Sequence, residues 1–410
     1  MTDRVIRVSL LRALRVRPFA LMWGGQTISR LGDALYRVAL AWWVLQKTGS
    51  AGAMGMVLVF TTLPMLLFLL IGGVAVDRFS RAKVMLVSDA LRGVLVAGMA
   101  WLAWADRLQM GYVYALAAVF GFVSAFFQPA YQALVPDIVP PDELPSANAL
   151  TSLSRQLVGI GGPALGASLV ALGGTTVAFA LDALSFALAA VCLLPLLRLA
   201  EAIAPATQRA SMLGELRAGL ALVFATPWLW ITIALFSLVN VTEGGPMAVG
   251  LPLLVQDHYG ADVGALGIFF SVMSLGSVLT AVWLGRAHAW RQRGVRAYGG
   301  ALIGGVAVMV IGLTTSLPIG WSAAFVNGAA LAVFGLIWTN TLQEMVPRDM
   351  LGRVVSVDML GSFVLLPIGY ALTGWLADQI GPAPVFVIGG ALTVALMALG
   401  LAHPAIRHLD

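Results

Sequence analysis

The chain has 410 residues, of which 60% are hydrophobic and only 10% are charged. Its mean hydropathy of +0.92 excludes an ordinary soluble fold, because so few polar side chains cannot cover so much apolar surface. The net charge of +5 does not indicate a nucleic-acid partner, since the basic residues fall in short segments between apolar runs. The composition therefore predicts a protein whose partner is the lipid bilayer.

Apolar runs of about 20 residues recur along the chain, each long enough to cross a hydrocarbon core of about 30 Å as a helix. The period-two alternation typical of a membrane barrel is absent from the sequence. The predicted spans are 18–45, 52–74, 84–105, 110–134, 149–172, 175–197, 228–256, 263–285, 298–316, 320–344, 353–377 and 382–402. The expected fold class is an all-α membrane protein with 12 transmembrane helices in two pseudo-symmetric six-helix bundles.

The basic residues predict the orientation of these spans. Most of the 24 Lys and Arg residues lie before the first span, after the second, in the central loop and after the eighth, whereas Lys47 and Arg107 fall on the other side. The positive-inside rule then places both termini in the cytoplasm. The basic N-terminus leads into a span without a small-residue cleavage site, so a signal peptide is not expected. The single cysteine, Cys192, excludes an intramolecular disulfide.

The longest polar segment divides the chain into two related halves. We expect the following parts: a basic cytoplasmic segment 1–17, a six-helix bundle 18–197, a cytoplasmic central loop 198–227 with a short amphipathic helix at 211–224, a second bundle 228–402, and a cytoplasmic tail 403–410. Val135-Pro136 overlies Val346-Pro347 at an offset of 211, and Gly73 overlies Gly285 at 212. An offset this constant indicates a duplication, which is typical of transporters that move two bundles around a midplane site.

The first span carries four polar residues, Gln26, Arg30, Asp33 and Arg37. Their spacings of four, three and four residues place them on one helical face. Because a charge inside a membrane costs several kcal/mol unless it is paired or hydrated, this face is expected to line a water-filled cavity. The alternative is that Asp33 only neutralises an arginine one turn away.

The seventh span repeats part of this pattern. At an offset of 210, Asp33 overlies Glu243 and Arg30 overlies Asn240. Loss of water favours the protonated form of a carboxylate, whereas a neighbouring arginine favours the ionised form. Asp33 and Glu243 are therefore the proton-coupling candidates, and we expect a proton gradient, with no cofactor, to drive the protein. The competing interpretation is that each carboxylate hydrogen-bonds across helices and keeps one protonation state.

The fourth and tenth spans combine aromatic and amide side chains, which suit a lipophilic or amphipathic small molecule. These further cavity candidates are Phe127, Gln128, Tyr131, Gln132, Trp338, Asn340 and Gln343. Plain helix packing is the alternative for any single aromatic residue. Gly162, Pro163 and Gly166 in the fifth span form a helix-packing motif.

The remaining charges and motifs limit the chemistry. Asp89 and Arg92 lie three residues apart in the third span and are expected to form a structural charge pair. Asp182 and Arg155 are expected to act as gates or as ties between helices, and the sequence does not separate these roles. No metal-ligand cluster, phosphate-binding glycine loop or nucleophile triad occurs in the sequence, and the loops are too short for a catalytic domain. We therefore expect neither an enzyme nor an ATP-driven pump.

The loop after the second span contains Gly73, Asp77, Arg78, Arg81 and Lys83. This pattern resembles the signature loop of the major facilitator superfamily, where it latches the cytoplasmic side of the protein. The resemblance implies the same gate role here.

Four further elements resemble the branch of that superfamily that contains macrolide-efflux and enterobactin-export proteins, within the drug:proton antiporters. They are Gly32-Asp33, 136–148, Gly162-Pro163 and 182–186. The fourth span lacks the arginine often found in drug antiporters, which shifts the coupling role to Asp33 and Glu243. The resemblance extends along essentially the whole chain.

We therefore expect a monomeric secondary exporter in a bacterial inner membrane, a proton antiporter that removes lipophilic or amphipathic drugs by alternating access. One alternative is an exporter of an anionic product such as a siderophore, since Arg30 and Arg37 could hold a carboxylate or phosphate. Another is a flippase for lipids or lysolipids, which would need no proton gradient.

Overall fold

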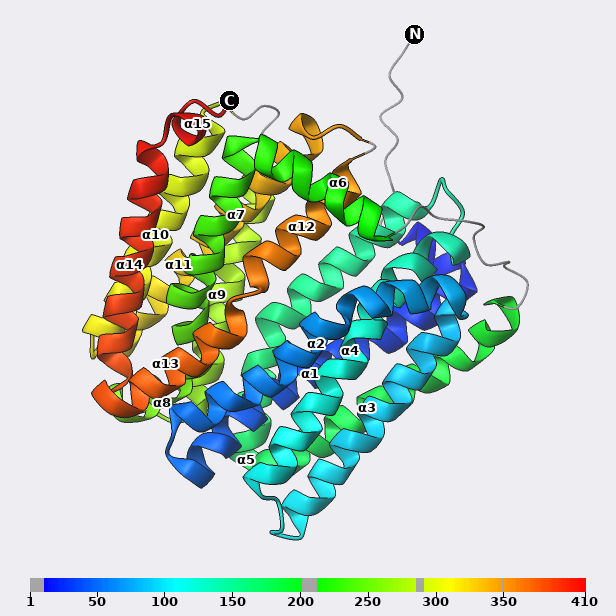
Figure 1. Ribbon diagram of the computed structural model, residues 1–410. Helices are drawn as coiled ribbons and strands as arrows, with labels where there is room; N and C mark the ends of the chain where they lie inside the picture. The colour runs from blue at the N-terminus through cyan, green and yellow to red at the C-terminus, as the bar shows by residue number, and fades with distance from the viewer. Residues whose placement is uncertain (1–10, 201–211, 285–290, 349) are drawn as a thin grey trace. The chain divides into compact units, whose positions relative to one another are not determined.

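The computed structural model describes residues 11–200, 212–284, 291–348 and 350–410 (Figure 1). Within these ranges the regular structure is helical, without strands. The helices are α1 (Arg17–Thr48), α2 (Ala51–Arg78), α3 (Arg81–Trp104), α4 (Met110–Ile138), α5 (Leu144–Ala200), α6 (Met212–Ala225), α7 (Pro227–Val239), α8 (Leu251–Leu253), α9 (Val263–Leu284), α10 (Arg293–Leu313), α11 (Leu317–Met345), α12 (Leu351–Phe363), α13 (Leu366–Ile380), α14 (Pro382–Ala402) and α15 (Pro404–Arg407).

The helix lengths confirm the predicted all-α membrane class. Ten helical segments in the described ranges are long and apolar enough to cross a membrane. One of them, Leu144–Leu197, contains 54 residues and would extend about 80 Å as a single helix. It is interrupted at Gly174, whose φ of 75° suits glycine, and so supplies the two spans predicted on either side of that residue. α1 is also long enough to cross a membrane, but its polar residues make it less apolar than these ten segments.

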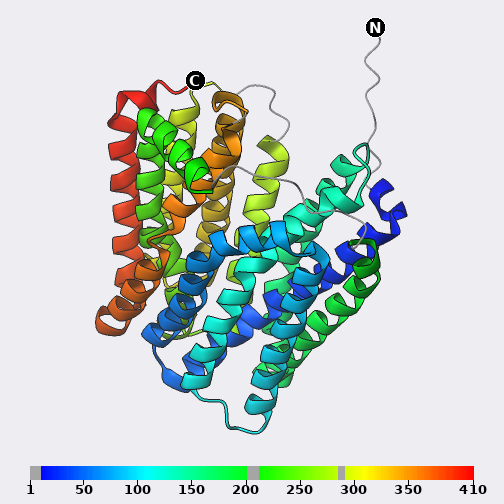
Figure 2. The same cartoon turned by 45° about the vertical axis from the view of Figure 1, so that its right-hand side comes forward.

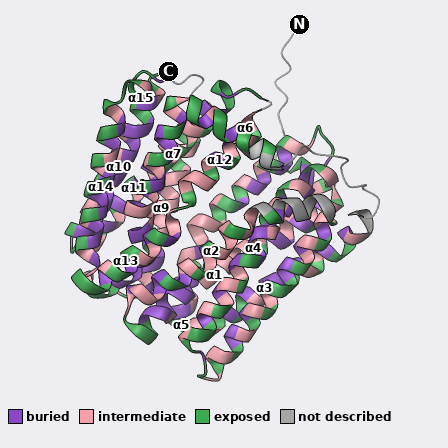
Figure 3. Cartoon of the chain, viewed as in Figure 1, coloured by how far each residue is buried: buried purple, intermediate pink, exposed green. Residues whose placement is uncertain are grey.

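Large apolar side chains remain exposed on the outside of these helices. Leu172 is 89% exposed, Trp104 76% and Trp283 72%. Figure 3 shows buried and exposed positions mixed along the same helices. Exposed apolar surface of this extent requires lipid rather than water as the solvent.

By its contacts the chain divides into two compact units. The first unit comprises Met1–Leu40 and Leu63–Thr207, and the second comprises Ala41–Thr62 and Gln208–Asp410. The second unit thus includes the end of α1 and the beginning of α2, which the sequence assigns to the N-terminal bundle. The part boundaries predicted from sequence are not otherwise tested, and residues 201–211 of the central loop lie outside the described ranges. α6 begins at Met212, next to the predicted start of the amphipathic helix.

In the first unit, α3 lies along α5, as Figures 1 and 2 both show. The buried residues of α3 recur every three or four positions and include Met85, Asp89, Arg92, Val96 and Met99. This spacing gives one continuous helical face toward the rest of the unit. Two ionisable side chains therefore lie within an otherwise apolar interface.

In the second unit, α10 packs between α14 and α11, and α11 also contacts α9. α7 continues beyond Val239 as three π-helical turns at Asn240–Gly244, Pro246–Gly250 and Leu254–His258. The predicted eleventh span is broken into α12 and α13, and Pro367 follows the break. Proline lacks the N–H that a continuous helix needs, which accounts for an interruption at this place.

The beginning of α2 joins the second unit because Asp378 of α13 caps it. The Asp378 carboxylate accepts hydrogen bonds from the backbone N–H groups of Ala51 (2.7 Å) and Gly52 (3.1 Å) and from the Ser50 hydroxyl (2.6 Å). The same hydroxyl oxygen accepts from the Ala53 N–H at 3.0 Å. Three of the four N–H groups that a helix start leaves unpaired are thereby satisfied, and the negative charge lies at the positive end of the helix dipole.

Ion pairs at equivalent places support the predicted duplication. Arg81, the first residue of α3, pairs with Asp137 near the end of α4. Arg293, the first residue of α10, pairs with Glu344 near the end of α11. The two arginines are 212 positions apart, the same offset that relates Gly73 to Gly285. Each unit therefore ties its third and fourth spans together through an equivalent arginine, although the acidic partners, Asp137 and Glu344, lie 207 positions apart.

Replacing Asp378 by alanine should lower the melting temperature of the purified protein. The change leaves the N–H groups of Ala51 and Gly52 without their partner, and loss of such a cap costs about 1–2 kcal/mol. Thermal unfolding in detergent measures the effect. The control is Asp142→Ala, which removes an exposed ion pair with Arg12 and should change stability by less than about 1 kcal/mol. Equal melting temperatures for the two variants would contradict the capping role.

Candidate functional site

α1 packs closely against α5 at Gly32, where two sequence motifs meet. A Cβ atom at Gly32 would lie 2.1 Å from Ser185 Oγ and 2.4 Å from Asp182 Oδ1. The backbone of α1 therefore touches the polar side chains of α5, an approach that only glycine permits. The elements Gly32-Asp33 and 182–186, which carry the sequence resemblance, thus form one contact.

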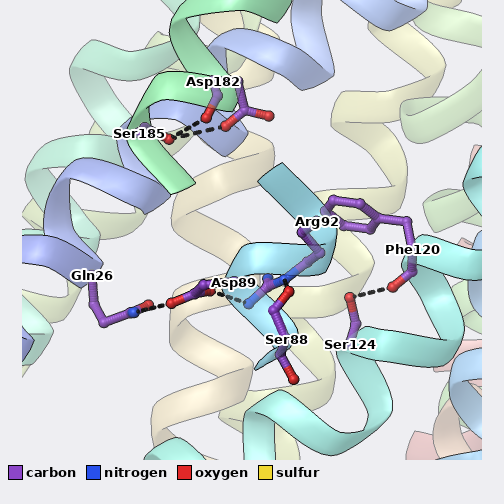
Figure 4. A network of polar contacts seen from close by, with 8 residues as sticks. All are labelled: Gln26, Ser88, Asp89, Arg92, Phe120, Ser124, Asp182 and Ser185. Carbon is purple, nitrogen blue, oxygen red and sulfur yellow. Dashed lines mark hydrogen bonds and ion pairs between the residues drawn. The ribbon is translucent and has the colours of Figure 1, made fainter. Parts of the chain in front are cut away.

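Arg92 is enclosed by three aromatic rings and one carboxylate, and Figure 4 draws Phe120 and Asp89 among these neighbours. Its guanidinium carbon lies 4.1 Å from the ring centre of Phe127, 4.8 Å from that of Phe186 and 5.7 Å from that of Phe120. Arg92 Nη2 also donates to Asp89 Oδ1 at 2.7 Å. The predicted charge pair is therefore present, and aromatic faces stabilise its cation where water is excluded.

The Asp89 carboxylate connects this pair to α1. Gln26 Nε2 donates to Asp89 Oδ2 at 2.7 Å, and both side chains are buried. Gln26 is thus a polar tie between α1 and α3 in this structure, as the dashed line in Figure 4 shows. Asp89 and Arg92 belong to the same polar group as the α1 stripe, a link that their sequence spacing alone does not reveal.

Asp33 lies among three cations without a direct partner. Arg92, Arg37 and Arg30 all interact with it electrostatically, yet within the described ranges its carboxylate forms neither a hydrogen bond nor an ion pair. Arg30 instead lies over the ring of Tyr131, 4.9 Å from the ring centre. Asp33 is partly exposed. Asp33 therefore forms no direct ion pair with Arg30 or Arg37 in this conformation, and both of its predicted roles, lining a cavity and neutralising an arginine one turn away, stay predictions.

In the second unit, Glu243 occupies the first π-helical turn after α7 and is buried. Its Oε1 accepts a hydrogen bond from Asn327 Nδ2 of α11 at 2.6 Å. Asn327 is fully buried, and its own Oδ1 has no hydrogen-bond partner in the described part of the chain. Among the described side chains Glu243 has no cationic partner, so an amide alone stabilises its carboxyl group.

Other predicted residues of the second unit serve as ties between helices. Asn240 Nδ2 donates to the Ser362 carbonyl at 2.9 Å, next to the break between α12 and α13. Trp338 Nε1 donates to Asp358 Oδ2 at 3.0 Å. Both bonds satisfy polar groups that lipid could not satisfy.

The remaining cavity candidates differ in exposure. Gln128, Gln132 and Gln343 are exposed, Asn340 is half-buried, and Phe127 and Tyr131 are buried. The ring of Phe127 is already in contact with the Arg92 guanidinium in this conformation. Roles in substrate binding stay predictions for all of them.

The gate motif is described only in part. The side chains of Gly73, Asp77 and Arg78 lie outside the described part of the chain. Arg81 forms the ion pair with Asp137 and also donates to the Ala133 carbonyl at 3.2 Å. Lys83 is exposed. The gate role itself stays a prediction.

The predicted helix-packing motif brings the first part of α5 against α1. A Cβ atom at Gly162 would lie 2.6 Å from Ala34 Cβ, and one at Gly166 would lie 3.1 Å from Leu35 Cα. Pro163 lies between them within α5. Small residues thus permit close approach on this side of α1 as well.

Two residues of the site were not identified from the sequence, and a third was identified without a distinct role. Asn327 and Asp358 were not singled out, although an amide or carboxylate inside an apolar span is itself a signal. Asp182 was recognised, but its contact with Gly32 joins residues 150 positions apart. No group of three or more His, Cys, Asp or Glu side chains suited to a metal ion occurs among the described residues.

Replacing Gly32 by alanine should destabilise the protein by about 1–3 kcal/mol, as expected for overpacking. The added methyl group would overlap Ser185 Oγ and Asp182 Oδ1. Melting temperature and detergent-solubilised yield measure the effect. Gly24→Ala is the matched control on the same helix, because nothing lies within 4 Å of a Cβ there. A double variant with Ser185→Gly should recover part of the loss, and equal stability of the two single variants would contradict the contact.

Comparisons with known proteins agree with this fold along nearly the whole chain. The multidrug efflux pump Tap of Mycolicibacterium fortuitum is 29% identical over 391 residues, which cover 92% of this chain and 94% of that protein. The macrolide efflux protein A of Streptococcus pyogenes is 23% identical over 401 residues, covering 96% and 97%. A crystal structure of a bacterial homologue of the iron transporter ferroportin, in its inward-facing state, superposes with a TM-score of 0.74 at 16% identity and covers 95% of this chain and 99% of that one. The family model of the Major Facilitator Superfamily matches residues 22–370, and the chain is therefore a multi-pass membrane transporter of the Major Facilitator Superfamily.

Proposed function

We propose that the protein is a proton-driven exporter of lipophilic or amphipathic small molecules, with multidrug or antibiotic efflux as its leading role. The observation that carries the proton coupling is the buried Glu243 carboxyl group, whose only described partner is the neutral amide of Asn327. A buried carboxyl group without a compensating cation can be neutralised by a proton. Gain and loss of that proton would change the charge inside the second unit.

The substrate class rests on two separate supports. The relatives with the names multidrug efflux pump Tap and macrolide efflux protein A align over nearly their full length. The chain also offers aromatic side chains beside amides, such as Trp338 and Asn340, which suit apolar guests with few polar groups.

Alternating access would use the two related units, each of which holds a polar group within its helices. The distribution of basic residues supports cytoplasmic N- and C-termini in a bacterial inner membrane. The proton gradient would be the only energy source, with no cofactor, and a monomer would suffice because each chain contains both units.

Export of an anionic product is a second candidate. Arg37 is exposed and forms no ion pair with a described residue, and Arg30 contacts the ring of Tyr131 rather than a carboxylate. Two cations on one face of α1 could hold a carboxylate or phosphate group.

The test uses purified protein in liposomes with an imposed proton gradient and a trapped pH dye. The panel comprises lipophilic cations, macrolides, tetracycline-like drugs and anionic siderophores, applied to the wild type, Glu243→Gln and Asp33→Asn. We expect drug-dependent proton flux in the wild type and its loss in at least one of the two variants, because each replacement removes a group that can carry a proton. Asp257→Asn is the matched control, since this exposed carboxylate lies on the same π-helical continuation of α7 as Glu243.

Each of the other outcomes of this assay would favour a different function. Proton flux only with siderophores, reduced by Arg37→Gln, would replace drug efflux by export of anions. The absence of compound-dependent flux with folded protein would contradict antiport, and unequal sidedness of a fluorescent lipid would then favour a flippase.

A further inference from the structure

Asp182 is a fully buried carboxyl group on the second part of α5, and its side chain has 0% exposure. Its Oδ2 atom has no hydrogen-bond partner among the described residues. An ionised carboxylate with an unpaired oxygen in an apolar interior is costly, and such groups are neutralised or paired instead. The proposed coupling through Glu243 and Asp33 gives this group no role.

The hydrogen bonds around Ser185 indicate which form Asp182 takes. Ser185 Oγ lies 2.7 Å from the backbone oxygen of Asp182 and 3.2 Å from its Oδ1 (Figure 4). A serine hydroxyl carries one hydrogen, and the shorter contact uses it for the backbone oxygen. The Ser185 hydroxyl then donates at most a weak, shared hydrogen bond to Oδ1 at 3.2 Å, whereas a protonated Oδ1 can itself donate a full hydrogen bond to the Ser185 oxygen. If Asp182 is protonated, each donor in this series of hydrogen bonds has one acceptor. If Asp182 is ionised, neither of its carboxylate oxygens receives a full hydrogen bond.

Neither of the two cations near Asp182 forms an ion pair with it among the described residues. Arg92 of α3 interacts with Asp182 electrostatically, but it donates to Asp89 and its flat faces contact aromatic rings. Arg37 of α1 also interacts with it, without an ion pair.

The other titratable groups facing Asp182 come from α1. Tyr36 interacts with it electrostatically and donates its hydroxyl to Met99 Sδ at 3.7 Å. Asp33 also interacts with Asp182 electrostatically. Its side chain is partly exposed. Asp33 directly follows Gly32, whose backbone touches the Asp182 carboxyl group. Asp33 is thus the neighbouring group best placed to exchange protons with water.

We propose that Asp182 and Asp33 together form a proton-binding site in the first unit, in which Asp182 holds the proton in this conformation and Asp33 exchanges it with water. The proton leaves the Asp182 carboxyl oxygen, the Asp33 carboxylate accepts it, and water takes it from Asp33, so that Asp182 becomes ionised and Asp33 returns to its starting form. The use of this site for coupling rests on the proposed proton antiport. The protonation of Asp182 in the resting protein does not depend on that proposed function.

The direct test is infrared spectroscopy of the full-length protein in lipid vesicles at neutral pH, without substrate and without a gradient. Subtracting the spectrum of Asp182→Asn from that of the wild type should leave the carbonyl-stretch band of a protonated carboxylic acid, and the band should shift in D2O. The control is Asp142→Asn, an exposed carboxylate that should give no such band. If Asp182→Asn does not fold, Ser185→Ala serves instead, because loss of the hydroxyl that contacts Asp182 should move the band without removing it.

A second readout separates this inference from the proposed function. In the liposome assay, Asp182→Asn should lose drug-dependent proton flux while still binding the drug as the wild type does. If the wild type shows no such flux but the band is present, antiport fails and the Asp182 site stands. If the band is absent and only ionised carboxylate bands are lost in Asp182→Asn, the inference is overturned, whatever the flux assay shows.

Discussion

Every polar side chain within a membrane-spanning helix must find a partner in the protein or in a hydrated space, because hydrocarbon supplies none. This constraint organises the first unit around Arg92, whose charge meets the Asp89 carboxylate and three aromatic rings. Gln26 extends the same group to α1. Among the described residues, Asp182 Oδ2 and Asn327 Oδ1 are buried polar atoms that find no hydrogen-bond partner.

The two units resemble each other in their ion pairs but differ in the polar groups that they bury. Arg81 and Arg293 form corresponding ion pairs at the ends of the third and fourth spans. At an offset of 212, however, Arg92 of the first unit corresponds to Gly304 of the second. That glycine leaves room beside Glu243 and Asn327, since a Cβ there would lie 3.7 Å from the Glu243 carboxyl. A duplicated scaffold thus holds an arginine–carboxylate pair in one unit and a carboxyl group bonded to an amide in the other.

Periodicity and length were enough to predict the spans, the helix break near Gly174 and the polar face of α1, because these depend on neighbouring residues. The contacts that define the site depend on residues far apart in sequence. Asn327 lies 84 positions from Glu243, and Asp378 caps a helix that begins 327 positions earlier. The π-helical turns after Val239 were also not predicted from the sequence.

Proton coupling through buried carboxyl groups requires that these groups exchange protons when substrate binds. The most direct measurement is the pH change of a weakly buffered solution of the purified protein in detergent when a lipophilic cation binds, with binding followed in parallel. The account predicts proton release that saturates together with binding and decreases when Glu243 or Asp182 is replaced by its amide. Saturable binding with no proton release across the neutral pH range would contradict it.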